Sequence, residues 1–164
     1  MPFECTLTDE SAEATIEKDG NGYAVSVVIG IDSDRNLTYF LFANLDVQAG
    51  GGDWAYGFFI VEYDGDTGGE YVYWSGRDVA SFIGRDDRRR ILDTLISVTH
   101  ILISQVKPER VHRSTHDTNL PDKALVKHQR VTDVFIECGY VIVQADTYLS
   151  THGWIMERDS GHDG

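Results

Sequence analysis

The chain has 164 residues, of which 41% are hydrophobic and 25% are charged, and it contains two cysteines. This length is typical of one domain, and the composition is that of an ordinary globular protein. A collagen, a coiled-coil rod, a disulfide-stapled mini-protein and a disordered tail are therefore excluded.

Acidic residues dominate the first half of the chain. The net charge is −13; residues 1–76 hold two basic and 14 acidic residues, whereas residues 77–164 hold 12 and 13. Such an acidic half repels the nucleic-acid backbone and anionic lipid, so we expect no nucleic acid to bind there. The charge fits either general solubility or docking on a basic protein or a cationic small molecule.

No segment predicts a targeting signal or a membrane span. The N-terminal sequence MPFECTLTDE lacks a basic region followed by an apolar core, and no apolar run approaches the ~18 residues of a span. Cys5 and Cys138 have no metal or redox spacing. We expect a cytoplasmic protein with no membrane contact.

The first 76 residues predict a meander of strands. Runs of β-branched and aromatic residues alternate with turn residues, and the short connections indicate antiparallel pairing. Apolar residues on both faces of residues 37–47 predict a central strand that is covered on both sides. The expected strands are residues 3–16, 23–31, 37–47, 54–63 and 70–74.

The second half predicts two helices and three strands. Apolar residues spaced four, three, four and four apart predict a helix over residues 86–106, which Lys107-Pro108 ends. Pro121 opens a second helix that carries a similar stripe and ends at Gly139, a left-handed cap. Strands are expected at residues 110–115, 140–146 and 153–157.

This order of elements predicts an α+β fold. The antiparallel meander over residues 3–75 continues into a β-α-β-α-β-β segment, which gives a mixed sheet with two main helices. We expect one domain over residues 1–158 and a polar C-terminal tail over residues 159–164.

The element order over about residues 55–158, with the phrase VFIECGY at residues 134–140, resembles the second half of the GNAT acyltransferases. The resemblance implies a GNAT-like fold, acetyl-CoA as cofactor and acyl transfer to an amine. It also implies a base and an acid, for which Tyr140, His116 and Tyr148 are the nearest candidates. The family's pyrophosphate loop, of form Arg/Gln-x-x-Gly-x-Gly/Ala, is absent from residues 75–90, and two carboxylates stand where phosphate would dock.

A cluster of arginines precedes the first long helix and would have to replace that loop. As cofactor-binding candidates the resemblance points to Gly84, Arg85, Arg88, Arg89 and Arg90. The first interpretation of the cluster is a solvated helix face paired with Asp86, Asp87 and Asp93; a contact for an acidic partner is the other alternative to a phosphate site.

The segment VHRSTHD at residues 111–117 holds two histidines four residues apart. On a strand that spacing is roughly 13 Å, too long for one metal ion, so no metal is expected. The segment is either the polar end of a strand or one side of a cleft lined by His112, Ser114 and His116. Cys138 is interpreted as a core residue rather than a nucleophile.

Two hypotheses of function follow. The first is a divergent GNAT-like acyl-CoA-dependent transferase. The second is a non-catalytic acidic module that docks a basic partner through residues 1–76, by a patch that includes Glu62, Asp64, Asp66 and Glu70. The aromatic residues of the strands are interpreted as core or as a binding face: Tyr39, Tyr56, Phe58, Tyr71, Tyr73 and Trp74.

Overall fold

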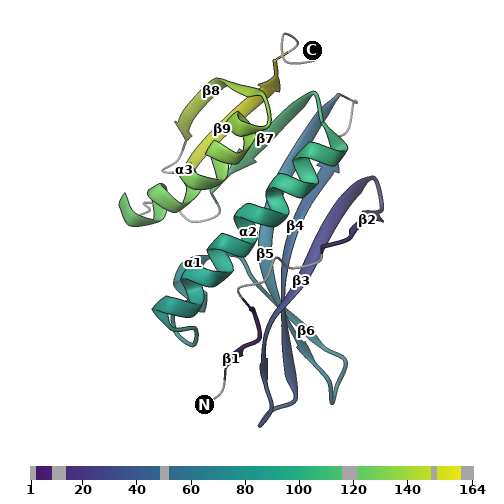
Figure 1. Ribbon diagram of the computed structural model, residues 1–164, viewed down its shortest axis with the longest axis vertical. Coiled ribbons are helices and arrows are strands. Elements are labelled where there is room, and N and C mark those ends of the chain that lie inside the picture. Colours follow the sequence, from purple (N-terminus) through teal and green to yellow (C-terminus); the bar gives the residue numbers. More distant parts are fainter. Residues whose placement is uncertain (1–2, 9–13, 49–51, 116–121, 149–150, 160–164) are drawn as a thin grey trace.

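The computed structural model describes residues 3–8, 14–48, 52–115, 122–148 and 151–159. They form one nine-stranded sheet with helices packed against it (Figure 1). The strands are β1 (Glu4–Cys5), β2 (Ile16–Asp19), β3 (Gly22–Asp32), β4 (Leu37–Val47), β5 (Asp53–Asp64), β6 (Glu70–Tyr73), β7 (Arg110–Ser114), β8 (Tyr140–Tyr148) and β9 (Thr151–Arg158). The helices are α1 (Gly76–Val79), α2 (Arg85–Val106) and α3 (Asp122–Glu137).

The sheet is mixed, as the sequence predicts. Its order is β1-β3-β4-β5-β7-β9-β8, with β2 also on β3 and β6 also on β5. All the pairs are antiparallel except β5 with β7, which are joined through the crossover helix α2. The chain is therefore α+β, with a mostly antiparallel sheet.

Several boundaries follow from local chemistry. Asn36 and Lys107 both adopt a positive φ, near 53° and 52°, where the β3–β4 turn and α2 end. Gly139, at a φ of 92°, separates α3 from β8, as the glycine after the helical stripe predicts.

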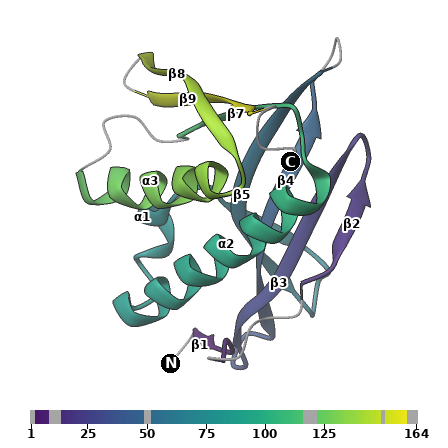
Figure 2. The ribbon, with the colours of Figure 1, turned by 45° about the horizontal axis from the view of Figure 1, so that its top comes forward.

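Two expectations about the first half are wrong. Residues 3–16 do not form one strand: β1 and β2 are two short strands that pair with different parts of β3. The strand β4 is central but is covered on one face only, because the helices described here lie on a single side of the sheet (Figures 1 and 2). The short helix α1 was not expected from the sequence.

The core lies between this helical layer and the sheet. Phe135 of α3 packs edge-on against Tyr56 of β5, with ring centroids 5.3 Å apart, and the Tyr56 hydroxyl lies 2.6 Å from Thr99 Oγ1 of α2. Its largest fully buried side chains include Tyr39, Ile29, Leu102 and Met156. No helix among the described residues is long and apolar enough to cross a membrane.

The opposite face of the sheet, called here the outer face, carries apolar residues that no described helix covers. Cross-strand partners share a face, so Val28, Phe40, Val61 and Val72 form one row. Phe42 and Phe59 stack beside that row with centroids 5.4 Å apart. Acidic residues stand in the rows at the two ends: Glu4 and Glu70 at one, and Glu17, Asp19 and Asp46 at the other.

Candidate functional site

The two parallel strands β5 and β7 pair over a short distance and then separate. Three residue pairs join them, from Asp53 with Arg110 to Ala55 with His112. Further along β5, the hairpin strand β6 begins to pair at Ile60. Residues 56–59 therefore have no strand partner on this edge among the described residues, whereas their other edge pairs fully with β4.

Three hollows adjoin along this unpaired edge, and together they are called the β5 groove. The first and second share Tyr56, Arg113 and Ser114, and the second and third share Phe58 and Trp74. Their volumes are about 350, 300 and 120 Å³. The groove begins where β5 and β7 separate and extends toward the first turns of α2.

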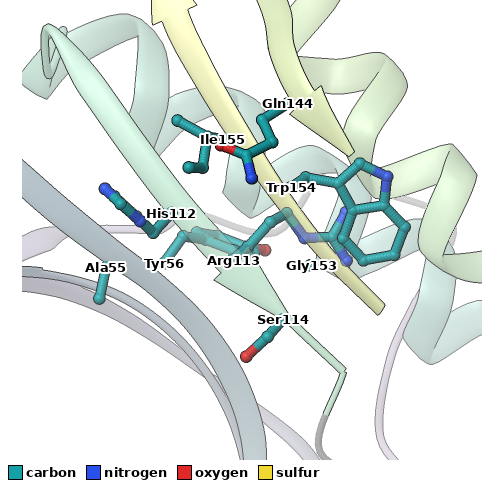
Figure 3. A pocket seen from close by; sticks show the side chains of 9 residues that line it. All are labelled: Ala55, Tyr56, His112, Arg113, Ser114, Gln144, Gly153, Trp154 and Ile155. Atoms are coloured by element: carbon teal, nitrogen blue, oxygen red, sulfur yellow. The ribbon is translucent and has the colours of Figure 1, made fainter. Parts of the chain in front are cut away.

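Arg113 lies at the centre of the first hollow (Figure 3). Its side chain points to the helical side of the sheet, where it is 4% exposed. Nη1 donates to the His128 carbonyl at 2.9 Å and to Thr132 Oγ1 at 2.6 Å, and Nη2 lies 2.9 Å from His128 Nδ1. The guanidinium carbon lies 4.6 Å from the centroid of the Trp154 ring.

These contacts hold Arg113 without neutralising it. Burial lowers the pKa of Arg113 to about 10, and the nearby Tyr56 acts in the opposite direction. Burial also raises the pKa of Tyr56 to about 12, so at neutral pH the pair is a cation beside a neutral phenol. The centre of the groove is therefore positively charged and largely removed from water.

His112 stands on the opposite side of β7 from Arg113, beside Ala55 of β5 (Figure 3). Its Nε2 lies 3.3 Å from Oδ2 of Asp53, and Nε of Arg110 lies 3.6 Å from the other oxygen of that carboxylate. Ser114 lines the same hollow, and Gln144 reaches it from β8. An imidazole paired with a carboxylate and open to a hollow can accept a proton from a bound group.

Of the three residues expected to catalyse, the structure describes the side chain of Tyr140 alone. Tyr140 is 3% exposed, donates its hydroxyl to the Pro108 carbonyl and does not line the groove. Burial raises its pKa. His116 lies outside the described residues, and of Tyr148 only the backbone is described, paired with Thr151 at the end of the β8–β9 hairpin. Their catalytic roles stay predictions.

Of the arginine cluster, only Arg88 lines the groove. Its Nη1 donates to the Ile83 carbonyl at 2.6 Å, and Lys127 of α3 lines the same hollow. Arg85, Arg89 and Arg90 are exposed. Asp93, which was expected to pair with the cluster, instead accepts from Arg130 of α3 at 3.1 Å.

Gly84 is the N-cap of α2, at a φ of −65°. A Cβ atom placed there would meet no other atom within 4 Å, so close packing does not require a glycine at this position. The first turn of α2 carries Asp86 and Asp87, as the sequence shows. An anion is therefore opposed at this helix N-terminus.

The described residues hold no group of three or more histidine, cysteine or acidic side chains arranged to bind a metal ion. Cys138 is half-buried, and burial, followed by the nearby Glu137, raises the pKa of its thiol. A raised pKa disfavours the thiolate that a nucleophile requires.

Sequence reasoning missed Arg113, which contacts more of the groove than any arginine of the cluster. The signal was the alternation of β7: Val111 and Arg113 are the buried positions of the strand, Thr115 directly after it is buried too, and His112 and Ser114 lie between them. An arginine between two buried positions of a strand is a candidate for a buried charge.

Comparisons with known proteins do not establish a family. No protein-family model matches the chain, and no curated protein matches it in sequence. Among solved structures, the chain is similar to a chimera of the spermidine N-acetyltransferase SpeG from Vibrio cholerae and hSSAT. That likeness has a TM-score of 0.31 and 7% sequence identity, over 76% of this chain and 68% of that chain. A likeness of this degree assigns neither a family nor any residue.

Proposed function

We propose that the β5 groove binds an acyl-coenzyme A and that the chain transfers the acyl group to an amine. The observation that carries this proposal is the unpaired edge of β5 at residues 56–59, exposed in a groove that has cationic side chains farther along it. The argument rests on the chemistry of the groove rather than on the likeness to a solved structure.

An unpaired strand edge suits a ligand that contains amides. Residues along such an edge present backbone N–H and C=O groups that an extended chain can pair with, as an added strand would. Four residues of β5 span about 13 Å. The pantetheine arm of coenzyme A is an extended chain with two amide groups, so its hydrogen-bonding groups match this edge.

The phosphate end of coenzyme A needs cations, and the third hollow supplies them. Arg88 and Lys127 line it from α2 and α3. Because Asp86 and Asp87 occupy the first turn of α2, we place the phosphates beside these two side chains and not on the helix N-terminus. Residues of this chain thus fit the cofactor without the usual glycine-rich loop.

Acyl-coenzyme A, when bound, supplies an acyl group activated as a thioester. The chain's own contribution is to orient the amine and to remove its proton. His112, held beside Asp53, is the described imidazole that lines the first hollow, and we assign it the role of general base. The acidic first half of the chain would attract a cationic acceptor.

Calorimetric titration of the purified chain with acetyl-CoA tests this proposal. Lys127→Gln removes a groove cation and is expected to weaken binding several-fold, whereas Arg89→Gln and Arg90→Gln remove exposed arginines outside the groove and serve as matched controls. In a thermal-unfolding experiment on the same variants, acetyl-CoA at 100 times its dissociation constant would add about 2.7 kcal/mol to the free energy of unfolding of a variant that binds it. No binding, or equal weakening by all three variants, would refute the placement.

A second function is favoured by the outer face. We propose that it docks a basic amphipathic segment of a partner protein, which deepens the hypothesis of an acidic interaction module. Val28, at the β3 end of the apolar row, is 43% exposed, and the rows of paired residues that end this surface contain acidic side chains and no lysine or arginine. Burial raises the pKa of Asp46, and the charge of the nearby Asp19 acts in the same direction.

A second copy of the chain suits this face less well. A two-fold interface brings the same surface against itself, so acidic ends would approach one another. A partner with apolar residues flanked by lysine or arginine avoids that repulsion and neutralises the ends.

A fluorescent peptide of alternating leucine and lysine probes the outer face. We expect binding that weakens at high salt and that Val28→Lys abolishes. Val126→Lys, on α3, places the same change at another exposed valine and should have no effect. Equal binding by both variants would exclude the outer face as the docking surface.

A further inference from the structure

Arg113 is a buried cation for which the described residues provide no carboxylate. Its hydrogen-bond partners are the backbone carbonyl and the imidazole of His128 and the hydroxyl of Thr132. Its guanidinium also lies over the aromatic rings of Trp154 and Tyr56. Buried charges are normally paired, because an isolated charge is costly to remove from water. An unpaired one at a hollow is the arrangement expected where a ligand brings the opposite charge.

The hydrogen-bonding capacity of Arg113 is only partly used. A guanidinium has five N–H groups. Nη1 uses both of its own on the His128 carbonyl and Thr132, and Nη2 uses one on His128 Nδ1. The N–H of Nε and one N–H of Nη2 have no acceptor among the described residues. A bidentate oxyanion needs two such donors.

We propose that Arg113 binds a carboxylate carried by a substrate of this chain, in the first hollow of the β5 groove. A carboxylate brings one negative charge, which balances one guanidinium, whereas a phosphate dianion would leave an excess charge in a buried place. The hollow has a volume of about 350 Å³ and is lined by the apolar side chains of Ala55, Trp154 and Ile155 and by polar ones of His112, Ser114 and Gln144, so the ligand that carries the carboxylate is small and can carry a further polar group.

The carboxylate has two sources under the proposed function, on which this inference rests for its biological purpose. It can belong to the acyl group, as in a dicarboxylic acyl thioester, or to the acceptor, as in an amino acid. Both place the charged end on Arg113, and His112 lies in the same hollow on the other side of β7.

The test measures binding of small carboxylates to the full chain, by ligand-observed NMR and by tryptophan fluorescence. Propionate and succinate represent the acyl source, and β-alanine represents the amino-acid source. We expect at least one of them to bind and Arg113→Met to weaken that binding about ten- to hundredfold. Arg113→Lys keeps the charge but loses the two-pronged geometry and should retain part of the affinity. Arg130→Met, which removes a half-exposed arginine of α3, is the matched control.

The results separate this inference from the proposed function. Tighter binding of propionate or succinate supports the acyl source, and tighter binding of β-alanine supports the acceptor source. The inference is overturned if no carboxylate binds, if Arg113→Met binds as the wild type does, or if inorganic phosphate binds more tightly than any carboxylate. If the protein binds a carboxylate but not acetyl-CoA, the Arg113 site is supported and the transferase is refuted. If it binds acetyl-CoA but no carboxylate, acyl-CoA binding is supported and the Arg113 site is refuted.

Discussion

Replacing Arg113 with methionine should leave the stability of the fold almost unchanged. The pKa of Arg113 falls from 12.5 to about 10 on burial, and each step of one in pKa corresponds to about 1.4 kcal/mol, so burying the charge costs about 3 kcal/mol. Methionine removes that cost, and its unbranched side chain fills much of the same space.

The favourable interactions that Arg113→Met removes are of a similar size. The substitution removes the three hydrogen bonds that Arg113 donates, to the His128 carbonyl, to Thr132 Oγ1 and to His128 Nδ1, although the carbonyl keeps the bond from Thr132 Oγ1 at 3.2 Å. Each lost hydrogen bond costs about 1 kcal/mol, and the lost contact with the Trp154 ring costs about 1 kcal/mol more. The terms cancel to within about 1 kcal/mol.

Urea denaturation measures this balance directly. We expect the free energy of unfolding of Arg113→Met to lie within about 1 kcal/mol of the wild type at an unchanged m-value. Phe135→Ala, which empties a fully buried position, should lose about 3–5 kcal/mol and calibrates the assay. A loss of 3 kcal/mol or more for Arg113→Met would show that the arginine holds the fold together, and would contradict its assignment as a ligand-binding charge.

Three further predictions concern the fold. Burial acts to raise the pKa of Asp32, but hydrogen bonds from the neighbouring guanidinium and turn amides outweigh it and hold the pKa below 3.8. The ionised Asp32 carboxylate therefore stabilises the fold above that pH, and this stabilisation is lost as the pH falls through the folded-state pKa. The melting temperature of Asp32→Asn should lie below that of the wild type at pH 7 and approach it near pH 2. Thr99→Val removes the partner of the Tyr56 hydroxyl and should cost about 1–3 kcal/mol in urea denaturation, unlike Thr94→Val on the exposed side of the same helix; equal losses would refute a role for the buried pair. Gly30→Ala would place a Cβ atom 2.3 Å from a ring carbon of the N-terminal segment and 2.8 Å from a backbone oxygen, so thermal denaturation should show a loss of about 1–3 kcal/mol, and an unchanged melting temperature would mean that this segment does not pack as described.

The order and type of the main elements could be predicted because their signals are local. Strands β3, β4 and β5 lie within one residue of their predicted bounds, since turn residues such as Asn36 separate them. The helix α2 begins one residue before its predicted start and ends where predicted, at Val106. Hydrophobic periodicity and turn chemistry are properties of short windows, so they are visible in the sequence.

The groove could not be predicted, because it depends on which strands become neighbours and on where their pairing stops. Nothing in the residues of β5 indicates that β7 pairs with three of them and then separates. The prediction that β4 is covered on both faces was wrong for the same reason, because apolar residues on both faces of a strand do not show that a helix packs on each side.

Clustering in the sequence was a poor guide to charged sites. Three carboxylates of the acidic patch expected at residues 62–70 make hydrogen bonds within the chain. Glu62 accepts from the hydroxyls of Tyr39 and Tyr73. Asp64 accepts from turn amides, and Asp66 accepts from the side chain of Asn36. The single Arg113, in contrast, reaches the centre of the groove because strand alternation turns it toward the helices.

Amide hydrogen exchange at residues 56–59 tests the central claim that the edge of β5 binds an extended amide ligand. In this strand, alternate residues direct their N–H groups to β4, and the others direct theirs to the groove. The account predicts that the groove-facing amides exchange rapidly in the free protein and become protected when acetyl-CoA is added, while the amides that face β4 stay protected throughout. Groove-facing amides that are already protected in the free protein, or that exchange equally fast with and without acetyl-CoA, would contradict it.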